Sequence, residues 1–520
     1  MASFTDGASL FPGQSAQYRW LARPETAFPF LLVTLLVLHA AVWAWFGAAS
    51  RSNFDYGGDM VETYAWGQAW QAGYFKHPPL SAWYTGAWFA IFPRTDLSYA
   101  WLASVNTAVG LAGFALLCRE FLDRRWTLAC VAAAALTPGL TAMALRFNAN
   151  AVLVSVWPLA MAFFVRAMNR GLTRDAIAAG LLCGLAMLGK YFSAMMLGAL
   201  LLSALLNAPW RARLFSRTGF CIAAVFAISL IPHGWWLVSH QFEPIRYARE
   251  ATGFSNDSAS IRGLQFAGRM LLFPALGLLL LWLTVRPQIR LGRFTTVLYK
   301  CLHPSPDPIW VLAIAPIVLS ALMTAITAAR ISTLWGLPMG MGLVLLVGSR
   351  LHAADSTKPR LRPAGLLLAV TWIITVIAAP VYWHASADRG DPMLTEPRLE
   401  LARAVDELWT EKVGTQLPWV SGPMQLAASV SFYAASRPGY ISSYQPERRT
   451  PWVDADSIKR DGGAIVCPGA DSGCIAGGKS LGGKPYDLTV SKSAWGRTFE
   501  PVSYSVVIVA PAARSPGAQQ

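Results

Sequence analysis

Long apolar runs separated by short polar segments occupy most of the first 383 residues. Eleven of these runs have about 16 to 22 residues, enough to cross a bilayer as a helix that rises about 1.5 Å per residue. They lie at residues 28–49, 98–118, 126–145, 150–167, 175–190, 192–207, 218–238, 264–284, 309–327, 331–349 and 363–383. A shorter apolar run at 79–93 is predicted to form an interfacial helix. The pattern predicts an all-α polytopic membrane protein with about 11 spans over residues 28–383, after a short N-terminal segment at 1–27.

The pattern changes after residue 383, where acidic and basic residues are balanced and Pro and Gly are frequent. Helix-like runs lie near 396–412 and 424–435, and strand-like runs lie at 464–467 and 503–510. These runs predict a small α/β domain over residues 384–520.

Two of the seven cysteines, Cys467 and Cys474, lie close together in this C-terminal domain. They flank a stretch that contains Pro and Gly, and an oxidising compartment outside the membrane favours a disulfide between them. Neither a histidine nor a further cysteine accompanies them. We therefore predict a disulfide and no metal site at this position.

Composition supports a membrane protein and locates the charge. Of the 520 residues, 54% are hydrophobic and 14% are charged, which leaves too few polar side chains to cover several soluble domains. The net charge of +15 falls entirely before residue 384, in short loops between the apolar runs. The positive-inside rule explains this excess and predicts a cytoplasmic N-terminus, with loops 50–97 and 239–263 and the C-terminal domain outside. The charge therefore requires no nucleic-acid partner.

The first outer loop holds the residue types that chemistry at a membrane surface needs. If a helix begins at Asp59, then Asp59, Glu62 and Trp66 share one face. Carboxylates there suit a general base or a metal ligand, although a capping box and an interfacial aromatic belt explain the same residues. Lys76 and His77 precede a rigid Pro-Pro pair and suit a lipid phosphate. A lysine that reaches toward headgroups is the alternative.

Together these residues resemble a known enzyme family, the family 39 glycosyltransferases, which are related to protein O-mannosyltransferases and the lipid A aminoarabinose transferase. The resemblance covers roughly residues 28–250 and is carried by Asp59, Glu62, Tyr64, Trp66 and the run Gly-Tyr-Phe-Lys-His-Pro-Pro-Leu at 73–80. It implies the membrane-embedded GT-C fold and inverting transfer of a sugar from a polyprenyl-phosphate donor to an acceptor on the outer face. It also implies a location in the bacterial inner membrane and an envelope lipid, glycan or protein as the acceptor.

The resemblance further implies roles for single residues. In the family, an acidic residue of this loop acts as the base or orients the acceptor, and Asp59 is the best match. Many members have adjacent Asp and Glu, so the choice between Asp59 and Glu62 stays open. Asn148 and Asn150 stand where members often have another acidic residue, so a metal held by paired carboxylates is not supported. These asparagines orient a sugar hydroxyl or cap a helix; no cofactor is required, and a divalent metal is left open.

Basic residues at the outer helix ends suit the donor phosphate, which gains negative charge as the sugar departs. Lys190 and Arg269 interrupt apolar runs, where a charge without a function is costly. Arg246 in an outer loop and Arg330 in a very short turn are further candidates, with headgroup-facing side chains as the alternative. The residues that we predict to hold the phosphate are Lys76, His77, Lys190 and Arg269.

Two other functions are compatible with the sequence. A flippase or transporter for lipid-linked sugars would use a similar charged cavity, but such carriers often have paired repeats and helices broken at the midplane. Here the polar candidates gather at one membrane face, which favours surface chemistry. A family member without activity is the third hypothesis, because a second carboxylate is missing.

Overall fold

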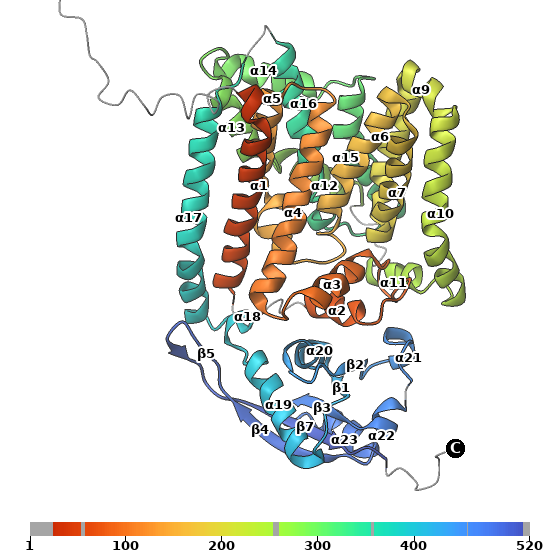
Figure 1. Cartoon of the computed structure of the whole chain (residues 1–520), viewed down its shortest axis with the longest axis vertical. Helices are drawn as coiled ribbons and strands as arrows, with labels where there is room; N and C mark the ends of the chain where they lie inside the picture. The colour runs from red at the N-terminus through yellow and green to blue at the C-terminus, as the bar shows by residue number, and fades with distance from the viewer. Residues whose placement is uncertain are drawn as a thin grey trace, which may run out of the picture.

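The computed structural model describes residues 24–51, 53, 58–252, 259–354, 358–454 and 456–512. Helices form an elongated bundle, and a smaller domain with a β-sheet lies at one end of it (Figure 1). Three helices lie between the bundle and this domain, namely α2 (Asp59–Gly67), α3 (Leu80–Ile91) and α11 (Glu243–Thr252). Most of the predicted N-terminal segment 1–27 lies outside the described residues.

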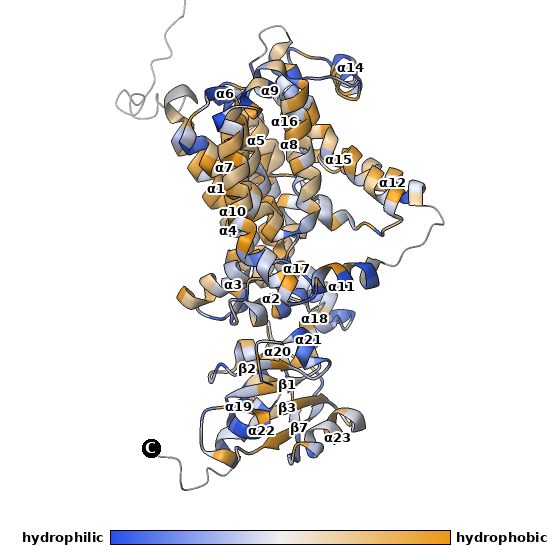
Figure 2. Ribbon diagram, turned by 90° about the vertical axis from the view of Figure 1, so that its right-hand side faces the viewer, coloured by the Kyte–Doolittle hydropathy of each residue, from blue (hydrophilic) through white to orange (hydrophobic). Residues whose placement is uncertain are grey.

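The bundle follows the predicted apolar runs, and hydrophobic residues dominate its helices (Figure 2). Its helices are α1 Pro24–Ala49, α4 Asp96–Arg119, α5 Arg124–Ala134, α6 Leu153–Arg170, α7 Thr173–Gly189, α8 Ala194–Leu206, α9 Ala208–Leu214, α10 Arg217–Ser239, α12 Ala259–Leu272, α13 Ala275–Val285, α14 Leu291–Cys301, α15 Pro308–Thr327, α16 Met339–Ala353 and α17 Leu361–Asp388. Short 3₁₀ turns lie at η1 Pro138–Leu140, η2 Ala142–Leu145, η3 Tyr191–Ser193 and η4 Thr333–Gly336.

The prediction of a helical polytopic membrane protein is confirmed, but the predicted number of spans is not. In the part of the chain that the structure describes, 6 helices are long and apolar enough to cross a membrane, or up to 8 if each of two bent pairs is one span. These helices lie at Ala27–Ala49, Asp96–Arg119, Arg217–Ser239, Ala259–Val285, Pro308–Thr327 and Leu361–Asp388. The predicted run at 175–190 forms a helix of 17 residues that is not among these candidates, and the run at 331–349 forms one of 15 residues that begins only after Pro338.

One predicted span breaks inside the bundle. The run at 126–145 forms α5 only as far as Ala134, and the chain then turns by 87° into η1 and η2. Pro138 begins η1, and the residue before a proline avoids the helical conformation. Gly139 allows the turn to approach another segment, because a Cβ at this position would lie 2.2 Å from the Leu337 backbone oxygen. After this break, the chain runs toward the outer-loop helices.

The segments predicted to lie outside the membrane gather at one end of the bundle (Figure 1). The predicted interfacial helix at 79–93 corresponds to α3, which packs closely on α2. This contact requires glycine, since a Cβ on Gly86 would lie 2.5 Å from the Gly67 oxygen. That this end faces the outside stays a prediction.

The C-terminal domain is built on a mixed sheet with the strand order β2-β1-β3-β7-β4. The β1 strand is parallel to β2 and β3, whereas β7 is antiparallel to β3 and β4. The strands are β1 Trp419–Gly422, β2 Gly439–Ser442, β3 Gly463–Pro468, β4 Lys484–Val490 and β7 Val502–Val509, with a separate pair β5 Ser493–Ala494 and β6 Arg497–Thr498. The helices are α18 Pro392–Thr395, α19 Arg398–Val413, α20 Met424–Tyr433, α21 Pro446–Arg449, α22 Ser457–Asp461 and α23 Ser472–Ser480. The small C-terminal α/β domain is thus confirmed, while its boundary at residue 384, close to the end of α17, stays a prediction.

Specific contacts hold the C-terminal domain against the bundle. Lys492 Nζ donates to Asn53 Oδ1 over 3.0 Å, and both residues are buried. The Phe432 ring of α20 also meets the Tyr64 ring of α2 edge-on, with 4.9 Å between the ring centroids. The domain is therefore fixed directly over the first outer loop.

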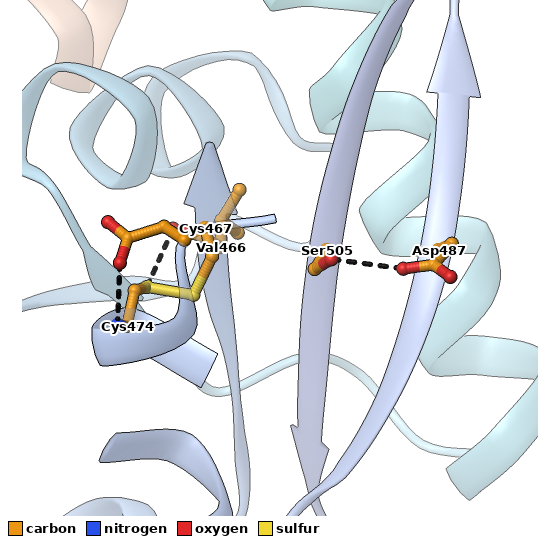
Figure 3. Close-up of a disulfide and its surroundings, with 6 residues drawn as sticks. Val466, Cys467, Cys474, Asp487 and Ser505 are labelled. Carbon is orange, nitrogen blue, oxygen red and sulfur yellow. Dashed lines mark hydrogen bonds between the residues drawn. A yellow bond between two sulfur atoms is a disulfide. The ribbon is translucent and has the colours of Figure 1, made fainter. Parts of the chain in front are cut away.

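Cys467 and Cys474 form the predicted disulfide, which joins the end of β3 to α23 (Figure 3). The Asp471 carboxylate accepts the Cys474 N–H over 3.0 Å and caps α23. On the neighbouring strands, Ser505 Oγ donates to Asp487 Oδ1 over 3.0 Å (Figure 3). The disulfide therefore fixes a helix on the sheet at the far side of the domain from the membrane bundle (Figure 1).

Replacing both Cys467 and Cys474 with Ser is expected to lower the free energy of unfolding of the C-terminal domain by about 2–3 kcal/mol, because the closed loop restricts the unfolded chain. Urea unfolding of the full chain, followed by proteolysis of the C-terminal domain, measures the change. Cys221→Ser, which alters a free cysteine of the bundle, is the matched control. An unchanged urea midpoint in the double variant would contradict the expectation.

Candidate active site

Helix α2 places two carboxylates in its first turn. Gly58 precedes the helix with a φ of +87°, which glycine adopts without strain, and a Cβ there would lie 2.8 Å from the Met424 side chain of the C-terminal domain. Asp59 and Glu62 follow on one face, as predicted. The Asp59 side chain is 34% exposed and the Glu62 side chain 9%. Asp59 is therefore the more accessible of the two carboxylates.

Lys76 forms ion pairs with both carboxylates. Its Nζ lies 3.0 Å from Glu62 Oε2 and 3.6 Å from Asp59 Oδ1. Burial opposes the charge on Lys76, but Glu62 and Asp59 outweigh it and raise the Lys76 pKa. Burial also raises the pKa of Glu62, which Lys76 partly offsets. Glu62 thus anchors the lysine, while Asp59 keeps the larger exposed surface.

Aromatic contacts hold the loop that carries Lys76. Trp66 stacks on Tyr74 with 4.8 Å between the ring centroids, and the Tyr74 hydroxyl donates to the Trp66 backbone oxygen over 2.7 Å. His77 follows on the same loop. Burial and the charges of Lys190 and Lys76 hold the pKa of His77 well below its usual range. His77 is therefore less readily protonated than an ordinary histidine.

Asn148 and Asn150 connect Asp59 to Lys190. Asn148 Nδ2 donates to Asp59 Oδ2 over 3.1 Å, and its Oδ1 accepts two backbone N–H groups of the turn that follows. Asn148 therefore both caps this turn and contacts Asp59. Lys190 Nζ donates to Asn150 Oδ1 over 2.5 Å and lies 4.3 Å from the centre of the Trp335 ring. The turn at residues 148–150 and Lys190 thus join the same cluster as the first outer loop.

The predicted arginines divide into two groups. Arg269 Nη1 lies 3.5 Å from Thr333 Oγ1 in η4, the turn that also supplies the ring under Lys190. Arg330 is exposed just before this turn. Arg246 instead pairs with Glu243 on α11 and lines a separate cavity of about 390 Å³ beside α21. Arg269 therefore contacts the turn beside Lys190, Arg330 precedes that turn in the chain, and Arg246 belongs to a different contact.

A cavity of about 270 Å³ lies beside the two asparagines, which form part of its lining. Two arginines that the sequence analysis missed also line it: Arg51 just after α1, and Arg146 just after η2. The remaining lining residues are Ala142, Met143, Leu334 and Leu337. The cavity thus combines basic, amide and apolar side chains next to the Asp59 cluster.

The C-terminal domain also reaches the first outer loop, which the sequence did not indicate. The Arg449 guanidinium of α21 lies 5.3 Å from the centre of the Phe75 ring and 4.9 Å from that of Tyr444. Its positive charge also acts on Glu62, opposing the rise in the pKa of that carboxyl. The cluster is therefore covered from the side opposite the bundle.

The donor set for a divalent metal is incomplete in the described part of the chain. No group of three or more His, Cys, Asp and Glu residues that could hold a metal occurs there. Asp59 and Glu62 both contact Lys76, and Asn148 contributes an amide instead of a carboxylate. The described residues therefore do not fit a divalent metal site.

Residues 76–236 match the family described as dolichyl-phosphate-mannose-protein mannosyltransferase. The lipid A galacturonosyltransferase RgtD of Rhizobium johnstonii is 26% identical to this chain over 248 residues, which cover 45% of this chain and 49% of RgtD. The chain thus matches about half the length of this relative.

Solved structures show a similar fold. ArnT from Cupriavidus metallidurans bound to undecaprenyl phosphate has a TM-score of 0.56 at 15% identity, over 93% of this chain and 99% of ArnT. ArnT in the apo state has a TM-score of 0.54 at 14% identity, over 91% and 97% of the two chains. The chain therefore has an ArnT-like fold, and its resemblance to the protein mannosyltransferase relatives of the family 39 glycosyltransferases is confirmed over residues 76–236.

Proposed function

We propose that the chain is an integral membrane glycosyltransferase. It transfers a sugar, with inversion, from a polyprenyl-phosphate donor to a hydroxyl of an envelope lipid, glycan or protein on the outer face. The observation that carries this proposal is the partly exposed Asp59 carboxylate in a cluster with Lys76 and, through the asparagines, Lys190. The undecaprenyl phosphate bound to ArnT and the lipid A named as the target of RgtD support the classes of donor and acceptor.

The reaction follows from the positions of the charges. The acceptor hydroxyl oxygen attacks the anomeric carbon from the side opposite the phosphate, and Asp59 accepts the hydroxyl proton. The bond from the anomeric carbon to the phosphate oxygen breaks, and its electron pair leaves with the polyprenyl phosphate. Lys76 and Lys190 stabilise the negative charge that grows on this phosphate, and His77 adds an N–H donor. Attack opposite the leaving group inverts the anomeric centre.

The neighbouring residues position these groups. Asn148 holds Asp59 through its amide, and Glu62 holds Lys76 through an ion pair. Arg269 contacts the turn beside Lys190 and extends the positive surface for the phosphate, and Arg330, just before this turn in the chain, is a further candidate for the same role. The base and the phosphate site thus come from different segments fixed by one hydrogen-bond network.

The same proposal assigns the parts of the chain. Residues 28–383 form the catalytic membrane domain of a bacterial inner-membrane protein with a cytoplasmic N-terminus. Residues 384–520 form a periplasmic domain that lies over the first outer loop and contributes to the choice of acceptor. The position of Arg449 beside Phe75 supports this role.

A transfer assay with the purified protein in detergent tests the proposal. Radiolabelled undecaprenyl-phosphate sugars and envelope lipids are supplied, and we expect label to appear on an acceptor together with free undecaprenyl phosphate. Liposomes that contain the protein and the same labelled donor test the flippase alternative. Movement of label across the bilayer without transfer would replace the enzyme with a flippase, and neither activity would indicate an inactive family member.

A further inference from the structure

Helix α10 brings a buried histidine to the loop that carries Lys76. His233 lies toward the end of α10, is 5% exposed, and has a hydrogen bond at each ring nitrogen. Its Nδ1 lies 2.7 Å from the Ala72 backbone oxygen, and its Nε2 lies 2.8 Å from the Tyr191 hydroxyl. The histidine therefore bridges two segments that are far apart in the sequence, and the proposed reaction uses none of these three residues.

The two partners determine the role of each ring nitrogen of His233. A backbone carbonyl only accepts hydrogen bonds, so Nδ1 carries a hydrogen and donates to Ala72. In the neutral imidazole Nε2 is then the acceptor, and the Tyr191 hydroxyl donates to it. Because both nitrogens are satisfied inside the protein, His233 acts on its neighbours and not on a substrate.

The Ala72 end of this bridge lies four residues before Lys76. The next residue, Gly73, lies against the Trp236 ring, because a Cβ at this position would be 2.3 Å from the ring atom Cε3. His233 and Trp236 are three residues apart and share one face of α10. Helix α10 therefore holds this loop at two consecutive residues.

The segment that follows Gly73 is a closed turn. The Tyr74 N–H donates to the His77 backbone oxygen over 3.1 Å, and the Tyr74 hydroxyl donates to the Trp66 backbone oxygen over 2.7 Å. Lys76 lies inside this turn. A shift of Gly73 is therefore passed on to Lys76.

The Tyr191 end of the bridge directly follows Lys190. Tyr191 begins η3, the short turn after α7, and α10 packs along α7 (Figure 1). The Lys190 ammonium group contacts Asn150 Oδ1 and the Trp335 ring, which are both uncharged. Since no ion pair with these partners holds Lys190, the anchoring of the next residue contributes to its position.

We infer that His233 and Tyr191 are positioning residues, which hold Lys76 and Lys190 at the separation that one donor phosphate requires. The inference rests on the proposed function, because that proposal places both lysines at the leaving phosphate. Two cations stabilise one phosphate only when both lie within hydrogen-bonding distance of its oxygens. Loosening the bridge therefore weakens phosphate binding without removing either cation.

Binding of undecaprenyl phosphate and of undecaprenol, which lacks the phosphate, tests the inference in the full chain. Tyr191→Phe keeps the ring and removes the hydroxyl that donates to His233. We expect this variant to bind undecaprenyl phosphate about five- to tenfold more weakly, the effect of one lost buried hydrogen bond. Its affinity for undecaprenol should equal that of the wild type, because the lysines act on the phosphate alone.

Further variants test the other end of the bridge and the specificity of the effect. His233→Phe loses both hydrogen bonds and should weaken phosphate binding at least as much as Tyr191→Phe. If thermal unfolding shows that it is not folded, His233→Asn, which keeps an N–H donor for Ala72, replaces it. Tyr299→Phe is the matched control, since Tyr299 is an exposed tyrosine of α14 at the opposite end of the bundle (Figure 1). It should leave both affinities unchanged.

A double-mutant cycle separates positioning from general packing. Lys190→Met removes a cation that the bridge holds in place. Adding Tyr191→Phe to Lys190→Met should then lower the affinity for undecaprenyl phosphate by about twofold or less, because the two changes affect the same contact. A residue that only supports the fold would cause the same loss in both backgrounds.

A Tyr191→Phe protein that binds undecaprenyl phosphate like the wild type overturns the inference. An equal loss for undecaprenol, or an undiminished loss in the Lys190→Met background, also overturns it. Absence of undecaprenyl-phosphate binding in the wild type would overturn both the inference and the proposed donor. If the expected binding pattern occurs but the wild type transfers no sugar, the proposed function fails and the positioning role stands.

Discussion

Replacing Asp59 with Asn lowers kcat for sugar transfer about 10²–10⁴-fold, the range that a positioned general base contributes. Asparagine has nearly the same shape and keeps an oxygen for the Asn148 amide, but it cannot accept the acceptor proton. Donor binding should change little, because Lys76 retains its shorter ion pair with Glu62. The measurement is the initial rate of transfer at saturating donor, with donor affinity measured separately.

Glu62→Gln is the matched control for Asp59→Asn. The Glu62 side chain is only 9% exposed and lies 3.0 Å from Lys76, so this change weakens the anchor of the lysine and leaves the base in place. We expect a smaller loss of kcat than in Asp59→Asn, with a weaker affinity for the donor. If Glu62→Gln loses as much kcat as Asp59→Asn, or more, the assignment of the base is wrong.

The parts of the fold that local pattern determines were predictable from the sequence. Apolar runs between basic loops indicated a polytopic helical protein, and the change after residue 383 indicated the C-terminal domain. The disulfide between Cys467 and Cys474 was predictable because the two cysteines lie close together in the chain and because the compartment outside the membrane is oxidising. The break after Ala134 was not predicted, because residues 135–145 are apolar enough to continue a span. Pro138 and Gly139 were a local signal that went unused, whereas the contact of Gly139 with Leu337 is visible only in the fold.

The sequence predicted the part of the candidate site whose residues lie in recognisable motifs. Asp59, Lys76 and Lys190 lie in one hydrogen-bonded and ion-paired cluster, although the roles assigned to them stay predictions. Arg146 lies two residues before Asn148, so its place in the chain was a signal that went unused. Arg449 had no such signal, since only the docking of the C-terminal domain brings it to the first loop.

Lys76→Met is expected to destabilise the protein by about 2–3 kcal/mol at neutral pH and to reduce transfer strongly. The change leaves the Glu62 carboxylate in a largely buried position without its nearest cation, and breaking a buried pair costs about 3–5 kcal/mol. The partial exposure of Lys76, with 20% of its side chain accessible, places the expected cost toward the lower end. Transfer falls because the leaving phosphate loses a positive charge.

The pH dependence of this variant follows from the direction of the Glu62 pKa. Burial already raises this pKa above the ordinary value of 4.5, and removing Lys76 takes away the charge that opposes the rise. In the folded variant Glu62 therefore binds a proton more readily than in the unfolded chain. The cost of Lys76→Met is largest above the raised pKa and diminishes as the pH falls through it.

A double variant separates the stability of the pair from its role in transfer. Lys76→Met combined with Glu62→Met replaces the pair with apolar side chains of similar length and should restore the free energy of unfolding to within about 1 kcal/mol of the wild type. Transfer should stay low, because the phosphate still lacks its lysine. Chemical unfolding in detergent at several pH values, together with kcat, measures both effects. A Lys76→Met protein as stable as the wild type at neutral pH, or a double variant no more stable than the single one, would show that Glu62 does not depend on Lys76.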